Sequence, residues 1–268
     1  MVDWLFNLPV VWMGALILGV IFLFTAVLYW VVTMLAANEG RARAFKAISP
    51  GILPPLSVIF ALLVGFLAAQ VWNEADRANT AVNREASALR AVVLLAHEFP
   101  GETEANLRQL IHDYIQHAVA EEWPAMARQD ATLTIAPPRM AKALHSILAL
   151  QPGREGQAIA QREMVSSIEN AFDARRQRII LSRSSINWVK WVVLFLQGAL
   201  TLVAIALVHC DNRAANRMIL AIFATGIGVA VLLIAAHSRP FTGEISVGPS
   251  VLLQVMPETE AGPQAAIH

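Results

Sequence analysis

The sequence predicts an all-α polytopic membrane protein with four transmembrane helices and an all-helical soluble domain between the second and third of them. Hydrophobic residues make up 56% of the 268 residues and charged residues only 15%, whereas about a quarter of the residues of a soluble domain are charged. Four stretches approach or exceed the roughly 20 apolar residues that cross a bilayer. The segment 72–187 is polar and lacks the alternating pattern of β-strands.

The four apolar stretches contain no Asp, Glu or Arg, and Lys190 lies only at the start of the third. The first is too long for a signal-peptide core and no Ala-x-Ala-like cleavage site follows it, so we expect it to be retained. The stretches are Pro9–Ala37, Leu53–Val71, Trp188–Val208 and Met218–Ala236.

These stretches divide the chain into four regions. The last of them has few apolar groups to bury beyond about residue 256, so we expect it to be disordered there. The regions are 9–71 with transmembrane helices 1 and 2, 72–187 as the helical soluble domain, 188–236 with transmembrane helices 3 and 4, and 237–268 as a C-terminal segment.

Three further helices are predicted within the soluble domain. From Leu107 to Val119, apolar residues recur at steps of three and four, which is typical of an amphipathic helix. Proline and glycine mark the ends of the predicted helices. The expected bounds are Pro100-Gly101 to Trp123-Pro124, Pro137-Pro138 to Gln151-Pro152-Gly153, and about Gln157 directly into the third span.

The stretch from residue 54 to 77 reads PPLSVIFALLVGFLAAQVWNEADR and passes from apolar to charged residues without a turn signal. We therefore expect one long helix that leaves the membrane and enters the soluble domain. At 100° per residue, one face of this helix is apolar in its N-terminal part and polar in its C-terminal part. On periodicity alone, its apolar part is explained by helix packing or lipid contact. The face holds Leu62, Phe66, Asn73, Arg77, Thr80 and Arg84, with Val58 and Gln70 at its edges.

An even number of spans places both termini and the soluble domain on one side of the membrane. Basic residues near the span ends are more numerous on that side, which favours a cytoplasmic location. The first nine residues, with Asp3 and no basic residue, favour the opposite orientation, so the rule leaves the question open. We expect a multi-pass inner-membrane protein with its termini and soluble domain in the cytoplasm.

Composition and motifs argue against several function classes. The formal net charge is zero, so no overall field attracts nucleic acid, and the single cysteine, Cys210, excludes an intrachain disulfide framework. No phosphate-binding glycine loop, nucleophile elbow or HExxH helix occurs. The sequence thus predicts no enzyme, catalytic residue, metal site or cofactor. We interpret Arg175-Arg176-Gln177-Arg178 as a solvated, membrane-proximal basic face attracted to anionic lipid.

Several motifs carry a resemblance to a known family. The stretch from Pro55 to Arg77, with its Gly65-Phe66 step, resembles the second transmembrane helix of bestrophins, and Arg239-Pro240-Phe241-Thr242-Gly243-Glu244 is similar to the segment after their fourth span. The whole layout resembles the small bacterial bestrophin-like membrane proteins, a domain family of unknown function. Two further segments carry this closer resemblance, Glu85-Ala86-Ser87-Ala88-Leu89-Arg90 and Glu121-Glu122-Trp123-Pro124.

The resemblance implies a pentameric ion channel, because in bestrophins the second helix of each subunit lines the pore and forms a hydrophobic neck. It implies that the partners are other copies of the chain, the lipid bilayer and inorganic ions. Bestrophin calcium sites use an acidic cluster where this chain has only Glu244, so no calcium site is implied. By position, the neck would be Val58, Leu62 and Phe66, and the vestibule Gln70, Asn73, Arg77 and Arg84.

Two of these vestibule residues, Arg77 and Arg84, would favour anions, but only slightly, because Glu74, Asp76 and Glu85 lie near enough in sequence to offset their charge. A non-conducting scaffold or sensor, assembled through the same helices, is the main alternative to a channel. A secondary transporter is disfavoured, because the spans show neither the intramembrane carboxylate or histidine nor the broken helix that transporters use.

Overall fold

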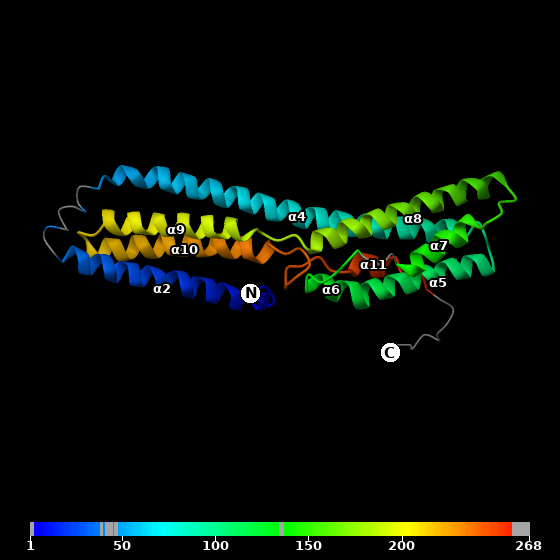
Figure 1. The fold of residues 1–268 in the computed structure, drawn as a ribbon, viewed down its shortest axis with the longest axis horizontal. Coiled ribbons are helices and arrows are strands. Elements are labelled where there is room, and N and C mark those ends of the chain that lie inside the picture. The colour runs from blue at the N-terminus through cyan, green and yellow to red at the C-terminus, as the bar shows by residue number, and fades with distance from the viewer. Residues whose placement is uncertain (1–2, 38–39, 41–44, 46–47, 134–136, 259–268) are drawn as a thin grey trace, which may run out of the picture. The chain divides into compact units, whose positions relative to one another are not determined.

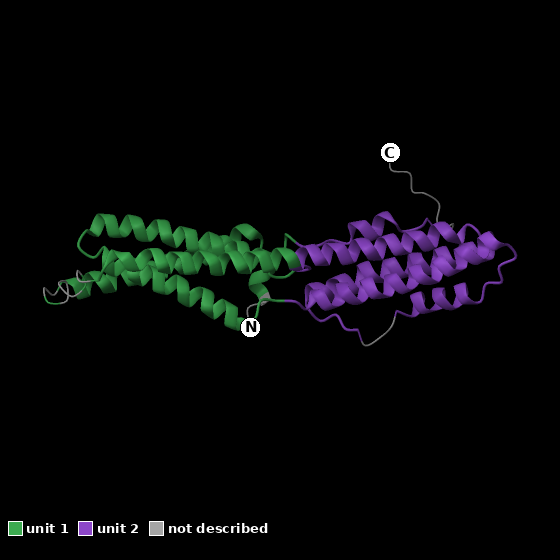
Figure 2. Ribbon diagram, turned by 90° about the horizontal axis from the view of Figure 1, so that it is seen from above, with its two compact units in different colours: residues 1–73, 185–239, 243–245 green, residues 74–184, 240–242, 246–268 purple. Residues whose placement is uncertain are grey.

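The computed structural model describes residues 3–258 except 38–39, 41–44, 46–47 and 134–136. Every regular element among these residues is helical, which confirms the all-α class (Figure 1). The segment expected to be disordered lies largely outside the described residues, from position 259 onward. The chain forms two compact units (Figure 2), which are residues 1–73, 185–239 and 243–245, and residues 74–184, 240–242 and 246–268.

The first unit contains the membrane-spanning helices. Four described helices are long and apolar enough to cross a bilayer. α10 packs against α2 and α9, and a Cβ at Gly228 would lie 2.4 Å from Leu18 Cδ2, so glycine permits the close approach of α10 to α2. The elements are α1 (Asp3–Phe6), α2 (Val10–Ala36), η1 (Pro50–Ile52), the first part of α4 (Leu53–Ala96), α9 (Trp188–Val208) and α10 (Arg213–His237).

Helix α4 is continuous over 44 residues, which confirms the predicted long helix. Pro54 and Pro55 lie in its first turn, where a backbone N–H has no acceptor within the helix. From there to Ala96 the chain has no further proline and a single glycine, Gly65, and Pro100-Gly101 follows the end. Residues up to Asn73 belong to the first unit and those from Glu74 onward to the second.

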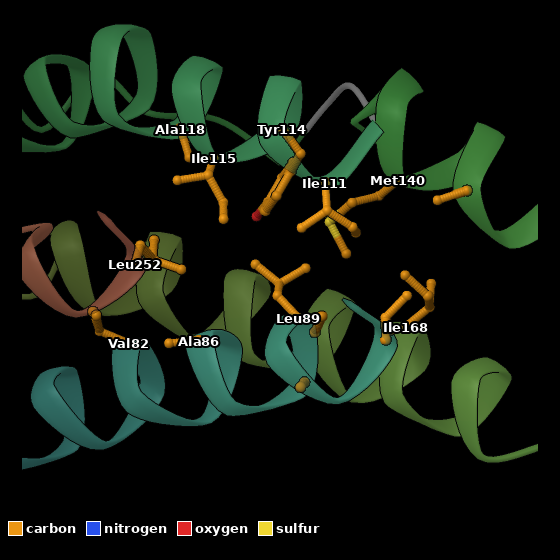
Figure 3. Close-up of a cluster of buried hydrophobic side chains, with 14 of the residues drawn as sticks. Val82, Ala86, Leu89, Ile111, Tyr114, Ile115, Ala118, Met140, Ile168 and Leu252 are labelled. Carbon is orange, nitrogen blue, oxygen red and sulfur yellow. The ribbon is translucent and has the colours of Figure 1, made fainter. Parts of the chain in front are cut away.

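The second unit is a helical bundle around one apolar core. Leu89, Ile111, Met140 and Ile168 are fully buried at its centre, and come from four different helices (Figure 3). Their three- and four-residue spacing along each helix explains why these segments pack together. Besides the second part of α4, the elements are α5 (Glu102–His117), the π-helical turn η2 (Ala118–Glu122), α6 (Trp123–Ala127), α7 (Pro138–Leu148), α8 (Glu155–Ser182) and α11 (Ser250–Gln254).

The prediction that the last domain helix runs unbroken into the third span was wrong. Helix α8 ends at Ser182, and residues 183–187 are not helical. Asn187 instead begins a new helix, because its side-chain oxygen accepts a hydrogen bond from the Val189 N–H at 3.1 Å. Serine and asparagine side chains compete for backbone hydrogen bonds, so the sequence Ser184-Ser185-Ile186-Asn187 favours a boundary. The short helices α1 and α11 were not predicted.

Candidate functional site

The apolar part of the predicted pore-lining face is uncovered. Val58, Leu62 and Phe66 on α4 are 57%, 56% and 73% exposed. Leu67 and Val71, on another face of the same helix, are buried in the core of the first unit. The three predicted neck residues therefore lie on a surface that the described part of the chain leaves uncovered.

The predicted vestibule residues do not all share this exposure. Asn73, Arg77 and Arg84 are exposed on α4. Gln70 is half-buried, and its side-chain oxygen accepts a hydrogen bond from Lys190 Nζ on α9 at 2.5 Å. Gln70 thus contacts a neighbouring helix of its own chain, and its role in a vestibule stays a prediction, as do those of the other six residues.

Exposed polar residues continue along α4 in the second unit. Together with α8 they line a groove of about 670 Å³, to which α4 contributes Thr80, Asn83, Arg84 and Ser87, and α8 contributes Asn170, Asp173 and Gln177. These polar and charged side chains suit contact with water or with another polar surface. The C-terminal part of α4 is therefore polar on the side that the helical bundle leaves exposed.

Another side of α4 carries the carboxylate of Glu85, which lies in the core and not beside the exposed arginines as expected from the sequence. Glu85, expected to offset the charges of Arg77 and Arg84, is completely buried. Its Oε2 accepts a hydrogen bond from Arg178 Nε at 2.7 Å, its Oε1 accepts one from Nη2 at 3.0 Å, and the Tyr114 hydroxyl also donates to Oε1. Glu85 is therefore part of the core and contributes little to the field outside the helix.

A second carboxylate completes this buried network. Arg178 Nη2 also donates to Glu122 Oε2 at 2.8 Å, and Arg175 Nε donates to Glu122 Oε1 at 2.8 Å. The Arg178 guanidinium carbon lies 4.5 Å from the centre of the Trp123 ring, a cation–π contact. Two arginines thus balance two carboxylates, as buried charges require. We refer to Glu85, Tyr114, Glu122, Arg175 and Arg178 as the buried ion-pair network.

Burial and charge have opposite effects on the pKa of Glu122. Removal from water would by itself raise the pKa, but the Arg178 charge and the Arg175 hydrogen bond outweigh burial and lower it. For Arg178, burial disfavours the cation, while Glu85 and Glu122 outweigh it and raise the pKa. Burial, followed by the Glu85 charge, raises the pKa of Tyr114 well above its ordinary value. The network consequently holds two arginine cations and two carboxylates, joined by three ion pairs, and a neutral phenol.

The interpretation of Arg175 to Arg178 as a solvated basic face was wrong for its two outer members. Arg175 and Arg178 are 8% and 0% exposed, and only Arg176 and Gln177 between them are exposed. The sequence could have indicated that Arg175 and Arg178 are buried, because they continue the three- and four-residue spacing of the buried side of α8. The preceding buried positions are Met164, Ser167, Ile168, Ala171 and Ala174.

The Glu121–Pro124 motif forms the turn that positions Glu122 and Trp123. Pro124 has no N–H, and a proline ring within a helix clashes with the carbonyl four residues earlier. The chain accommodates it with the π-helical turn at Ala118–Glu122. Trp123 Nε1 then donates to the Val247 carbonyl at 3.1 Å, and its ring meets Phe241 edge-on at 6.1 Å. Two of the motifs singled out in the sequence therefore contact each other.

The remaining part of the Arg239–Glu244 motif contacts the start of the first unit. The Glu244 Oε2 atom accepts a hydrogen bond from the Val10 N–H, at the N-terminus of α2, at 3.0 Å, where a helix dipole favours a negative charge. Gly243 has a φ of 90°, and a Cβ there would lie 2.8 Å from the Phe6 carbonyl oxygen. Glycine is thus required on both conformational and steric grounds. Glu244 is accordingly used as a helix cap.

The fold and this candidate site define an all-α membrane protein with four spans, a long second helix and a helical domain built on a buried ion-pair network. A profile of the bestrophin-like domain matches residues 10–252, and the chain belongs to this bestrophin-like family. This membership confirms the resemblance found in the sequence. Comparison with characterised protein sequences finds no significant match.

Solved structures show the same fold at low sequence identity. A variant of a bacterial bestrophin homolog from Klebsiella pneumoniae is 10% identical, with 89% of this chain and 97% of that chain covered and a TM-score of 0.71. A second variant of this homolog is 11% identical, with 91% and 96% covered and a TM-score of 0.69. A structure of the homolog phased with zinc is 11% identical, with 90% and 95% covered and a TM-score of 0.66.

Proposed function

We propose that the chain is the subunit of an oligomeric ion channel whose pore is lined by α4. The observation that carries this proposal is the uncovered face of one unbroken helix, apolar at Val58, Leu62 and Phe66 and polar from Asn73 onward. In a ring of subunits, such faces would form an apolar constriction followed by a hydrated vestibule. Apolar constrictions can close a pore by dewetting. Membership of the bestrophin-like family supports the same function.

Self-association is part of this proposal. A lone chain would leave Asn73, Arg77 and the polar groove beside Arg84 uncovered. A closed ring gives each copy the same environment and lets these groups share one aqueous space. We infer a homo-oligomer in the inner membrane, with the pentamer of bestrophins as its form, the lipid bilayer around it and inorganic ions as what it conducts.

Two measurements on the purified protein test the proposal. Mass determination of the detergent-solubilised protein should give a stable oligomer, and the same sample in planar bilayers should carry discrete ionic currents. A stable monomer would contradict the pore. Intact oligomers that carry no current under any ionic gradient would instead support the alternative, a non-conducting scaffold or sensor assembled through the same helices.

Anion preference is a second feature of the proposal, and the burial of Glu85 supports it. Of the three acidic residues near Arg77 and Arg84, Asp76 is exposed, Glu74 is half-buried, and Glu85 faces Arg178 in the core. The two exposed arginines are therefore offset less than their neighbours in sequence indicate. In a ring of subunits each arginine is repeated around the pore, and such rings of charge select ions.

Reversal of one of these charges should change ion selectivity. We expect Arg77→Glu to lower the anion-to-cation permeability ratio several-fold, because a ring of acidic groups replaces a ring of basic ones. The reversal potential under a salt gradient measures this ratio. Lys142→Glu, an equal change of charge at an exposed position of α7, is the control. Equal shifts in the two variants would remove Arg77 from the permeation path.

We further propose that the second unit and both termini lie in the cytoplasm. The excess of basic residues on that side supports this orientation. On intact cells stripped of outer barriers, a membrane-impermeant thiol reagent should label Cys210, which lies between α9 and α10. It should not label Gln109→Cys on the exposed face of α5 in a Cys210→Ala background. The reverse labelling pattern would establish the opposite orientation.

A further inference from the structure

The only charged residue in the four apolar stretches is Lys190, in the first turn of α9. A lysine at the end of a span usually extends its side chain into water. Lys190 is instead half-buried, and its Nζ donates a hydrogen bond to Gln70 Oε1 on α4 at 2.5 Å. Both residues belong to the first unit. The charge of Lys190 is therefore held beside the helix that lines the proposed pore.

The start of α9 is an unfavourable place for a cation. The N-terminus of a helix carries a partial positive charge, which favours acidic residues in the first turn. The first turn of α9 contains no acidic residue, and no carboxylate of the described residues forms an ion pair with Lys190. A charge that neither its own helix nor an acidic partner stabilises is expected where a protein uses that charge, above all at the edge of a membrane.

The ammonium group of Lys190 keeps hydrogen-bonding capacity beyond its contact with Gln70. A lysine ammonium has three N–H donors, and Gln70 supplies the only acceptor for them among the described residues. Two donors remain for water or for an anion that passes the helix. Hydrogen bonds from a cation to an anion are stronger than those between neutral groups, so this group can replace part of the hydration shell of an anion.

The contact with Gln70 places this charge at one end of the proposed neck. Gln70 follows Phe66 by about one helical turn, roughly 6 Å along α4, and at 100° per residue it lies about 40° from Phe66 around the helix. Phe66 is 73% exposed on the face proposed to line the pore. The Lys190 ammonium therefore lies beside that face, and in a ring of subunits the charge would be repeated where the neck ends.

We propose that Lys190 is a specificity-determining residue that attracts anions to the end of the apolar neck nearest Phe66. This inference rests on the proposed function, because it assigns a role within the pore lined by α4. Arg77 is exposed, whereas Lys190 is half-buried, and dissolved salt screens buried charges less than exposed ones. Lys190 thus acts at the constriction, and Arg77 acts farther along the vestibule.

The test is the anion-to-cation permeability ratio of purified oligomers in planar bilayers. Lys190→Met keeps an unbranched side chain without its charge and should lower the ratio several-fold, whereas Lys190→Arg should keep it. The effect of Lys190→Met should persist near 1 M salt, where the Debye length falls to about 3 Å, while that of Arg77→Gln should shrink. Arg213→Gln, at the exposed start of α10, removes a charge elsewhere in the first unit and should leave the ratio unchanged.

A second variant tests the charge in channels that have already folded and assembled. Lys190→Cys in a Cys210→Ala background should show the low ratio of Lys190→Met. A thiosulfonate reagent that attaches an aminoethyl group should then raise the ratio in the same channels, and one that attaches a sulfonatoethyl group should lower it further. Mass spectrometry of the protein confirms one label per chain.

The possible outcomes separate this inference from the channel itself. A wild-type ratio in Lys190→Met, or labelled Lys190→Cys channels that do not respond to the sign of the added charge, would overturn the role of Lys190 and leave the channel in place. An equal loss in Lys190→Met and Lys190→Arg would assign Lys190 to helix packing, and an equal loss in Arg213→Gln would assign the effect to overall charge. Wild-type oligomers without current would overturn the proposed function, and this inference with it.

Discussion

Replacement of Phe66 by alanine is expected to give a several-fold larger and more persistent current in planar bilayers. Phe66 is the largest and, at 73%, the most exposed of the three proposed neck residues, so in the proposed ring its side chain would occupy the most space in the neck. Alanine there widens the constriction and lowers the tendency of water to leave it. The measurement is the single-channel current and the open time of matched oligomers.

A phenylalanine outside the proposed pore provides the control. Phe24 lies on α2 and is 44% exposed, so Phe24→Ala removes the same aromatic surface from another span of the first unit. Phe24→Ala should leave the current unchanged. If both variants behave alike, Phe66 does not line the pore, and if the wild type and Phe66→Ala oligomers are both silent, the scaffold or sensor is favoured.

Replacement of Arg178 by methionine is expected to destabilise the second unit by about 3–5 kcal/mol, the cost of removing one partner from a buried ion pair. Glu85 and Glu122 would keep their charges in the core while losing their shared donor. The unfolding midpoint, followed by helical circular dichroism in detergent, measures the loss. Arg176→Met, two residues away and exposed, should change the midpoint little.

A double variant separates the loss of charge balance from the loss of packing. Glu85→Gln together with Arg178→Met leaves one carboxylate and one arginine, Glu122 and Arg175, in contact at 2.6 Å. We expect the double variant to be more stable than Arg178→Met alone, since coupled residues are not additive. Equal stability of Arg178→Met and Arg176→Met would contradict the structural role of the buried ion-pair network.

The same network predicts how stability depends on pH. The folded-state pKa of Glu122 is lowered, so its contribution is fully present above the unfolded-state pKa of a glutamate. That contribution is lost as the pH falls through the lower, folded-state value. Glu122 therefore adds to the loss of stability in acid.

Several features of the fold could be predicted because they depend on neighbouring residues. Apolar length alone identified the spans that became α2, α9 and α10, and the absence of a turn signal after Pro55 identified the long helix α4. Proline and glycine positions located the start of α5 and both ends of α7, whereas the helical path expected to end near Trp123-Pro124 continues through η2 and α6 to Ala127. Periodicity likewise placed Val58, Leu62 and Phe66 on one face of α4, and the structure leaves that face uncovered.

Other features depended on residues far apart in the chain. Glu85 and Arg178 are separated by 93 positions. The sequence around each of them predicts a helix with charged residues and does not indicate that the two side chains meet. The contact of Trp123 with Phe241 likewise requires the packed helices. A local pattern determines helix length, helix ends and which face is apolar. Only the tertiary structure determines which charged residues are buried together. Removing a charge from water costs free energy, and this cost is offset by an oppositely charged partner that lies far away in the sequence and comes close only on folding.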